Sequence, residues 1–297
     1  MEKKTRTLFI GNQKGGVGKT SAVFETGYIL STRGYKVLLI DADAQRNLTS
    51  GAGVDVNTKK NIYTAINGLV DFNETIVHVR NNLDLIPGAS QMTADHFTLA
   101  EGTYALREAI EVMVENLGFD YDFILIDVGP GGGQLMNMAL VAADYLITVA
   151  TLTKFAYEGV EMMCADLGRG KKTYVNFKVK PLGILVNTFK KSNESEWRQS
   201  CFEELEKVYG ASMFPTQLGI CGVMDQCKEE NMAFTEYEKH TRKSNAAYFK
   251  LAKQYQEFVD DREELQSFLH FTVPAIDTML EISTSIITNG VIHGICL

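Results

Sequence analysis

The sequence predicts an α/β fold with a mostly parallel β-sheet that is covered by helices on both faces. Short apolar runs alternate with longer amphipathic stretches along the chain, which is the order of β-α-β units. The apolar runs are continuous in Val, Ile and Leu, as expected of strands buried on both faces. The 297 residues, 45% of them hydrophobic, suffice for one large domain or two small ones.

The expected elements follow one another from the N-terminus. A strand at residues 7–10 leads into a glycine-rich loop and a helix at about residues 19–33, which Gly34 ends. The further expected elements are strands at residues 37–40, 83–86, 123–126, 145–150 and 182–186, and a helix at residues 104–117 that Gly118 ends.

The chain shows no internal repeat and no low-complexity linker. We therefore expect one domain over residues 1–260. Residues 261–297 form a C-terminal tail that we expect to be helical, with Pro274 between two apolar segments. Packing against the core is the expected role of this tail; the alternatives are an extension of a dimer and a segment foreign to any family that the rest of the chain resembles.

Several classes of protein are excluded by the composition. The N-terminus lacks the apolar run of a secretory signal, and no 18-residue apolar segment could span a membrane. The five cysteines include no C-x-x-C pair, and the five histidines show no metal-binding spacing. These features predict a cytoplasmic protein with reduced thiols.

The most informative segment lies directly after the first expected strand. Residues 14–20 read Lys-Gly-Gly-Val-Gly-Lys-Thr, and glycines let such a backbone fold tightly so that its N–H groups point at phosphate oxygens. The helix that follows adds its positive N-terminal end. Lys19 would neutralise the β- and γ-phosphates, and the Thr20 hydroxyl would ligate Mg²⁺. The placement between a strand and a helix argues against a chance glycine-rich turn.

Acidic residues end two other expected strands. Asp41 and Asp43 follow the strand at residues 37–40, and Asp127 follows the strand at residues 123–126. Carboxylates at the carboxyl ends of parallel strands are where Mg²⁺ would lie. Each group alone could equally serve as a helix cap, but together with the loop they indicate a nucleotide site.

The loop resembles the deviant Walker A motif of the ParA/MinD family, in the short form without an N-terminal helix-turn-helix domain. Gln13 stands where the strict motif has glycine, and Lys14 adds a second lysine. The residues Asp41-Ala-Asp43-Ala-Gln45 resemble the second family motif, and residues 123–127 resemble a Walker B strand. The resemblance extends diffusely over about residues 5–258. It implies a P-loop NTPase fold and a weak Mg-dependent ATPase.

The resemblance also implies roles for individual residues. Two subunits would clamp two ATP molecules, with Lys14 reaching the phosphates of the partner and Asp43 positioning the attacking water. Lys14, Lys19 and Asp43 are thus the expected catalytic residues, and Thr20, Asp41 and Asp127 the expected Mg²⁺ shell. The expected nucleotide contacts are Lys14, Gly15, Gly16, Val17, Gly18, Lys19, Thr20, Ser21, Asn187 and Pro215.

Three departures from the family motifs concern the switch segments. Ala44 replaces the usual proline, and Arg46 replaces a usual glycine. The segment after Asp127 reads Val-Gly-Pro-Gly-Gly-Gly rather than a Pro-Pro-Ser run. More glycine predicts a more mobile segment, and hence a changed coupling of hydrolysis to the dimer.

Three kinds of family member compete. An iron–sulfur reductase would need a cysteine pair that bridges the dimer, but no cysteine precedes Cys164. A membrane-bound ATPase of the MinD kind would end in a basic amphipathic helix, whereas the last basic residue here is Arg262. A partition ATPase bound to DNA is the reading that remains favoured.

A basic stripe supports the DNA interpretation. The chain has a net charge of −8, yet residues 169–253 carry 15 Lys and Arg against 10 Asp and Glu. On a helical projection of residues 238–258, five cations share one face, and Tyr248, Leu251, Tyr255 and Phe258 share the opposite face. Lys171, Lys172, Lys190 and Lys191 could join this surface. The five cations are Lys239, Arg242, Lys243, Lys250 and Lys253.

Such a stripe would contact phosphates without recognising bases, although a solvated helix face is the simpler alternative. Only 13 residues precede the loop, so we expect no helix-turn-helix and only non-specific DNA binding. The resulting prediction is a nucleoid-associated ATPase for plasmid or chromosome partition. It would form a homodimer on ATP and would be stimulated by a ParB-like partner. A MinD-like or protein-cargo positioning ATPase without DNA contact is the alternative.

Overall fold

The structure is a computed structural model, and it describes residues 5–93, 99–116, 118, 120–153, 156–187, 196–219, 224–240 and 252–260. The described residues form one seven-stranded sheet in the order β3-β4-β2-β5-β1-β6-β7. All neighbouring strands are parallel except β3, which pairs antiparallel with β4 at one edge. The strands are β1 (Arg6–Gly11), β2 (Val37–Ala42), β3 (Val77–Arg80), β4 (Leu83–Ile86), β5 (Phe123–Val128), β6 (Tyr145–Thr151) and β7 (Lys180–Asn187).

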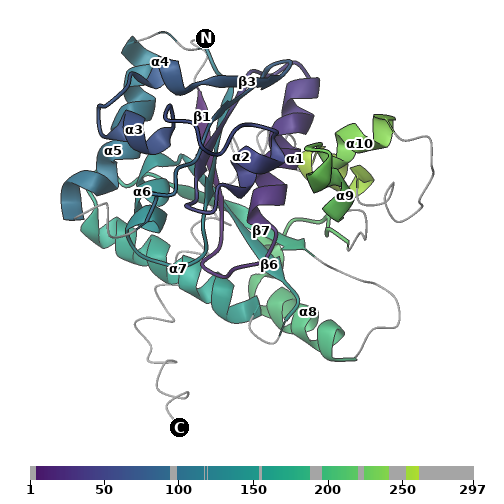
Figure 1. Ribbon diagram of the computed structural model, residues 1–297. Helices are drawn as coiled ribbons and strands as arrows, with labels where there is room; N and C mark the ends of the chain where they lie inside the picture. Colours follow the sequence, from purple (N-terminus) through teal and green to yellow (C-terminus); the bar gives the residue numbers. More distant parts are fainter. Residues whose placement is uncertain are drawn as a thin grey trace.

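Helices cover both faces of this sheet (Figure 1). The helices are α1 (Lys19–Thr32), α2 (Asn47–Gly51), α3 (Ile62–Ile66), α4 (Phe72–Thr75), α5 (Leu99–Glu111), α6 (Gln134–Ala142), α7 (Ala156–Thr173), α8 (Glu196–Tyr209), α9 (Met224–Glu229), α10 (Phe234–His240) and a helix over residues 252–260. A π-helical turn, η2 (Val112–Asn116), continues α5, and a 3-10 turn, η3 (Gly210–Ser212), follows α8. The predicted α/β class with helices on both faces is thus confirmed.

Alternate residues of the central strands pack into two separate hydrophobic cores, one on each face of the sheet. Leu8 and Ile10 of β1 pack with α1, whereas Phe9 between them packs with α6 on the opposite face. The strands are therefore apolar on both faces, which is why their sequences show continuous apolar runs. A third cluster joins α7 and α8 to the outer strands β6 and β7.

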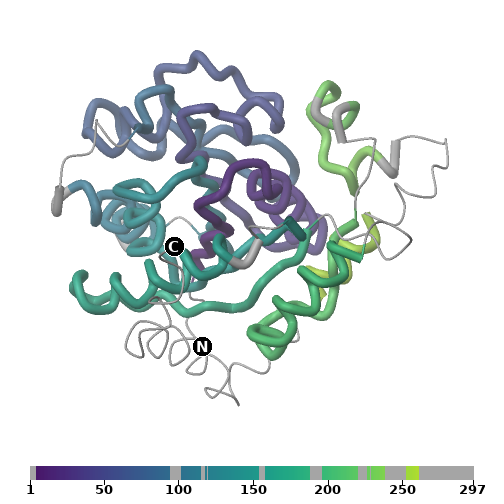
Figure 2. The backbone as a smooth tube through the Cα atoms, turned by 90° about the horizontal axis from the view of Figure 1, so that it is seen from below, coloured from purple at the N-terminus to yellow at the C-terminus, as the bar shows by residue number. Residues whose placement is uncertain are grey.

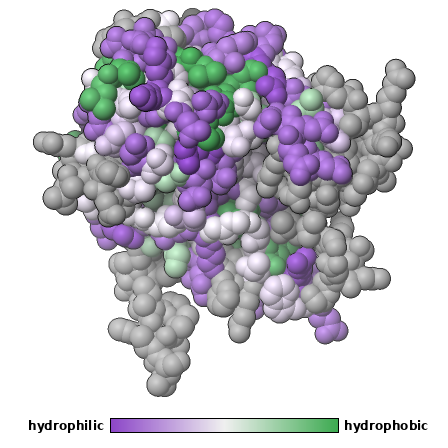
Figure 3. All heavy atoms as spheres, viewed as in Figure 1, coloured by the Kyte–Doolittle hydropathy of each residue, from purple (hydrophilic) through white to green (hydrophobic). Residues whose placement is uncertain are grey.

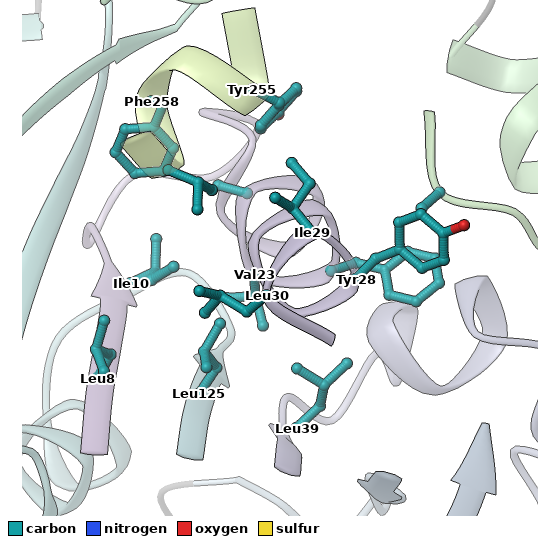
Figure 4. Close-up of a cluster of buried hydrophobic side chains, with 14 of the residues drawn as sticks. Leu8, Ile10, Val23, Tyr28, Ile29, Leu30, Leu39, Leu125, Tyr255 and Phe258 are labelled. Carbon is teal, nitrogen blue, oxygen red and sulfur yellow. The ribbon is translucent and has the colours of Figure 1, made fainter. Parts of the chain in front are cut away.

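Helix α1 lies at the centre of the first core and is the element that positions the site. Figure 4 shows its Val23, Ile29 and Leu30 directed at side chains of the sheet and of the helix at residues 252–260. That helix contributes Tyr255 and Phe258, both fully buried. Because Tyr255 and Phe258 were expected on the apolar side of the basic stripe, this part of the prediction is confirmed.

The end of α1 contacts the last described helix of the chain, at residues 252–260. The Arg33 guanidinium, just after α1, binds Asp260 at 2.5 Å and Gln256 at 3.1 Å. Figures 1 and 2 show α9 and α10 on one side of α1 and the helices α3 to α5 on the other. The last described segments of the chain thus pack on the helix that begins at the predicted nucleotide site, whereas α3 and α5 belong to the core on the opposite face of the sheet.

The structure corrects one helix boundary. We expected a helix from residue 104, but α5 begins at Leu99 and includes Gly102. Glycine disfavours a helix interior by about 1 kcal/mol, but the packing of α5 against α6 outweighs this cost. The predicted division at residue 260 stays a prediction, because residues 261–297 lie outside the described part of the chain.

Candidate functional site

The glycine loop connects β1 to α1, as the sequence predicts. Gly16 and Gly18 adopt positive φ angles of 72° and 92°, and Gly18 is the N-cap of α1. A Cβ atom on Gly18 would lie 2.1 Å from the Asn187 side chain. Glycine is therefore required at position 18 by both its backbone conformation and its packing.

Lys19 is buried at the first turn of α1, and its ammonium group donates a hydrogen bond of 2.8 Å to the Lys14 carbonyl. Burial lowers the pKa of Lys19, and the nearby carboxylates of Asp127 and Asp43 oppose this effect. A buried ammonium group that faces the loop interior is suited to bind phosphate oxygens.

The loop borders a cavity of about 480 Å³, a size typical of small-ligand sites. The predicted phosphate-binding residues and Asp43 lie around the same cavity, and residues of the helix α2 form another part of its wall. Its lining residues are Gly15, Gly16, Val17, Gly18, Lys19, Thr20, Ser21, Phe24, Asp43, Gln45, Asn47, Leu48, Ser50, Gly51 and Pro130.

Two predicted nucleotide contacts lie near the loop but do not line this cavity. The Asn187 side chain, at the end of β7, donates to the Val17 carbonyl at 2.8 Å. Pro215 is exposed beside β7, in a segment held by hydrogen bonds from Phe214 to Ile184 and from Leu218 to Val186. Their contact with a nucleotide base stays a prediction.

Asp41 and Asp127 lie side by side at the carboxyl ends of β2 and β5, and both are fully buried. Neither carboxylate oxygen of Asp127 accepts a hydrogen bond from a described residue. Burial and then the negative charge of Asp41 raise the Asp127 pKa well above its ordinary value. Thr20 lies close enough to oppose that rise, without completing a hydrogen bond of good geometry.

These groups fit a divalent cation. Mg²⁺ prefers oxygen ligands, few of them supplied by protein carboxylates. The unpartnered carboxylate of Asp127 beside the Thr20 hydroxyl offers such oxygens at the floor of the loop. Bound there, the ion would also remove the repulsion between Asp127 and Asp41.

Asp41 differs from Asp127 because its oxygens are already held by the protein. One oxygen accepts the Asp43 backbone N–H at 3.1 Å, and the other accepts the Thr49 N–H at 2.8 Å and the Thr49 hydroxyl at 2.6 Å. Burial raises the Asp41 pKa to about 6, although the hydrogen bonds from Thr49 oppose the rise.

Asp43 lines the same cavity as Lys19. Its carboxylate accepts the Gln45 N–H at 2.9 Å. A Cβ atom on Gly129 would lie 2.6 Å from the same carboxylate, so the segment after β5 packs directly on Asp43. Asp43 is therefore placed where both switch segments and the loop meet.

Lys14 is not among the residues that line the cavity. Its ammonium group forms an ion pair of 3.1 Å with Glu158 on α7. The neighbouring Gln13 donates to Asp166 on the same helix at 2.5 Å, and its carbonyl accepts the Gly131 N–H at 2.6 Å. The start of the loop is thus tied to α7 and to the glycine-rich segment.

Few of the predicted DNA contacts fall within the described residues. Lys253 is exposed on the helix at residues 252–260 and pairs with Glu257 at 3.3 Å. The Lys239 side chain and the residues Arg242, Lys243 and Lys250 lie outside the description, as do Lys190 and Lys191. Lys171 and Lys172 are exposed at the end of α7.

The character of the described surface can be followed in Figure 3. Hydrophilic side chains cover most of the described surface visible in Figure 3, with smaller apolar areas. Within the described ranges, no helix is both long and apolar enough to cross a bilayer.

Thr49, Glu158 and Asp166 are site residues that sequence reasoning missed. Each contacts a predicted site residue or its neighbour in the loop through a side chain to which the sequence analysis gave no role. Their partners are 8, 144 and 153 residues away in the chain.

Known proteins match much of this chain in sequence and in fold. Residues 5–180 match the family AAA_31, described as an AAA domain. The chromosome-partitioning ATPase Soj of Thermus thermophilus is 32% identical over 213 residues, which are 72% of this chain and 80% of that protein. A Borrelia burgdorferi protein assigned to plasmid partition, solved with AMPPNP, is 25% identical, with a TM-score of 0.70 over 88% of this chain and 99% of that chain. The cobyrinic acid a,c-diamide synthase of Mycobacterium smegmatis, solved with ADP and magnesium, is 25% identical, with a TM-score of 0.67 over 86% and 93%.

Proposed function

Because the chain belongs to the ParA-type family of P-loop ATPases, we propose that it is an ATP-driven partition switch. It dimerises around Mg-ATP, binds DNA without sequence preference in that state, and is released by hydrolysis that a ParB-like partner stimulates. The observation that carries the proposal is the single cavity shared by the glycine loop, Lys19 and Asp43.

The loop supplies the nucleotide contacts. Residues 15–21 offer backbone N–H groups and the Lys19 ammonium to the phosphates. Similar solved structures hold AMPPNP in one case and ADP with magnesium in another, which supports ATP and Mg²⁺ here. Asn187 and Pro215 are proposed to contact the base.

In hydrolysis, the carboxylates of Asp41, Asp43 and Asp127 would have different roles. Bound Mg²⁺ would neutralise phosphate charge, with Thr20 and Asp127 as its protein ligands and Asp41 in the surrounding shell. Asp43 faces the cavity and is proposed to orient the attacking water. Its position against Gly129 means that the switch segment must be ordered for Asp43 to be correctly aimed.

Dimerisation is proposed to depend on Lys14. Its ammonium group is paired with Glu158 on α7, and Lys14 is not among the residues that line the cavity. In a dimer, Lys14 would exchange Glu158 for the phosphates of the partner's nucleotide. A cation supplied by one subunit to the ATP of the other makes the dimer sensitive to the γ-phosphate.

Two variants test the ATPase assignment. Lys19→Ala should bind Mg-ATP about ten- to a hundred-fold more weakly, because a charge-assisted phosphate contact is lost. Asp43→Ala should keep its ATP affinity, accumulate as a nucleotide-bound dimer and release little phosphate. Calorimetry, sedimentation with ATP and a phosphate-release assay provide the three measurements.

The two variants act as controls for each other, because both remove a buried charge that lines the same cavity. Unchanged ATP affinity in Lys19→Ala contradicts the loop assignment. Normal phosphate release by Asp43→Ala moves the catalytic role to another residue, with Asp41 the next candidate.

A further inference from the structure

Thr49 is a buried polar residue that none of the family motifs quoted above includes. It lies on α2 and is fully buried. Its hydroxyl donates to one Asp41 carboxylate oxygen at 2.6 Å and accepts the Gly88 N–H at 2.8 Å. The Thr49 backbone N–H donates to the same Asp41 oxygen at 2.8 Å. A single hydroxyl therefore joins α2, β2 and the segment after β4.

The other oxygen of Asp41 continues this connection into the cavity. It accepts the backbone N–H of Asp43 at 3.1 Å, while the Asp43 carboxylate accepts the Gln45 N–H at 2.9 Å. A hydrogen-bonded path thus runs from Gly88 through Thr49 and Asp41 to the backbone of Asp43.

Close packing leaves Asp41 little freedom. A Cβ atom on Gly88 would lie 2.8 Å from the Asp41 carboxyl carbon, which is closer than real Cβ contacts allow. The Asp41 carboxylate is confined between the Gly88 backbone and Thr49. Its direction then depends on the hydroxyl that both donates to it and accepts from Gly88.

We propose that Thr49 is a positioning residue for ATP hydrolysis: its hydroxyl orients Asp41, and Asp41 holds the backbone from which Asp43 presents its carboxylate to the attacking water. This inference rests on the proposed ATPase function. Thr49 is not among the described residues that line the cavity, so it acts only through Asp41 and Asp43.

This position predicts a split between kcat and ATP affinity. Phosphate binding depends on residues 15–21, none of which contacts Thr49 in a hydrogen bond given above. The geometry of Asp43 depends on the Thr49 hydroxyl. Because a misplacement of roughly 1 Å in a catalytic group costs on the order of a hundred-fold in rate, loss of the hydroxyl should lower kcat far more than it weakens ATP binding.

The decisive substitution is Thr49→Val, which keeps the branched shape and removes the hydroxyl. We expect kcat to fall about ten- to a hundred-fold, with the calorimetric Kd for Mg-ATP within about twofold of wild type. Thr49→Ser restores a hydroxyl at the same place and should recover most of the turnover.

Thr26→Val is the matched control. Thr26 is a fully buried threonine on α1 whose hydroxyl has no hydrogen-bond partner among the described residues. The same chemical change there should leave both kcat and Kd unchanged, which separates the effect of the hydrogen bond from that of burying a valine.

The possible results are distinct. Wild-type kcat in Thr49→Val, or an equal loss of kcat and ATP affinity, overturns the positioning role. If Thr49→Val does not fold, the pair Thr49→Ser and Thr49→Ala carries the test, because they differ only in the hydroxyl, and equal turnover in the two overturns the proposal. A wild-type chain that neither binds nor hydrolyses ATP refutes the proposed function itself.

Discussion

Lys14 and Lys19 lie five positions apart in one loop but have different surroundings. Lys19 is buried, and its ammonium donates inside the loop. Lys14 keeps a quarter of its side chain exposed and pairs with the half-exposed Glu158. An ion pair exposed to this degree contributes about 0–1 kcal/mol, so Lys14 can leave Glu158 at little cost.

Lys14→Ala should therefore separate nucleotide binding from dimerisation. The monomer should still take up Mg-ATP, because Lys19 and the backbone N–H groups remain. Sedimentation should show a dimer fraction that no longer rises with ATP. Lys60→Ala is a suitable control, since it removes an exposed lysine paired with Glu74 at 2.7 Å. A fall in ATP affinity with an unchanged dimer would mean that Lys14 serves the nucleotide of its own subunit.

At this scale, motif spacing predicted residues that the fold brings together around one cavity. Lys19, Thr20 and Asp43 do meet in one cavity, because a strand–loop–helix and neighbouring strand ends fix their positions. Thr49 and Glu158 could not be predicted. Their roles come from contacts that form only when the chain folds. In the sequence alone, a threonine or a glutamate looks like an ordinary surface residue.

Among the elements, α1 connects the nucleotide loop to the segments near residue 240. Glu25 of α1 is fully buried and accepts hydrogen bonds from the backbone N–H groups of Phe234 and Thr235 and from the Thr235 hydroxyl. Glu236 in the same turn pairs with Arg80 of β3 at 2.8 Å. The start of α10 is thus held between α1 and the edge of the sheet.

Burial raises the pKa of Glu25 to about 7, against the hydrogen bonds that favour its charged form. A carboxyl whose pKa rises on folding contributes stability that is fully present below its unfolded pKa and is lost as the pH rises through the folded pKa. The free energy of unfolding should therefore decline between about pH 4.5 and pH 7, by on the order of 3 kcal/mol from this group.

Glu25→Gln should make that decline shallower, because the amide cannot ionise. Denaturant unfolding at several pH values between 5 and 7.5 gives the comparison. Glu203→Gln, at an exposed position on α8, should keep the wild-type slope. Parallel slopes in wild type and Glu25→Gln would show that Glu25 does not ionise in this range.

Sequence reasoning was most successful for long apolar strands and least successful for short elements. The strands β1, β2, β4, β5, β6 and β7 were each expected within two residues of their bounds. The edge strand β3 and the helices α2 to α4 were not expected. They are four or five residues long, too short for a periodic pattern, and packing rather than propensity holds them.

For the whole molecule, charge distribution decides how DNA would be bound. The net charge of −8 opposes a polyanion, while residues 169–253 carry a net positive charge. One basic stripe should bind weakly, and two stripes in an ATP dimer should bind more tightly because the contact becomes bivalent. Binding should also weaken steeply with salt.

Replacing both Lys243 and Lys250 by Glu should abolish ATP-dependent binding to duplex DNA and leave ATP-dependent dimerisation intact. Fluorescence anisotropy at several salt concentrations measures the first, and sedimentation the second. The double variant Lys59→Glu and Lys60→Glu makes the same change of charge at exposed positions between α2 and α3. DNA binding that survives the first double variant would leave the stripe a solvated surface and favour a protein-cargo positioning ATPase.

The late contribution of residues 252–260 to the core also has a consequence for protein synthesis. Tyr255 and Phe258 complete the packing over α1, although α1 itself is made within the first tenth or so of the chain. A nascent chain can order its N-terminal strands early. However, the packing over α1, the helix that follows the glycine loop, cannot be completed until the ribosome has synthesised nearly the whole domain. We therefore expect the proposed ATP site to be completed late in translation, and incomplete chains to be unable to enter the proposed ATP-bound dimer with finished copies.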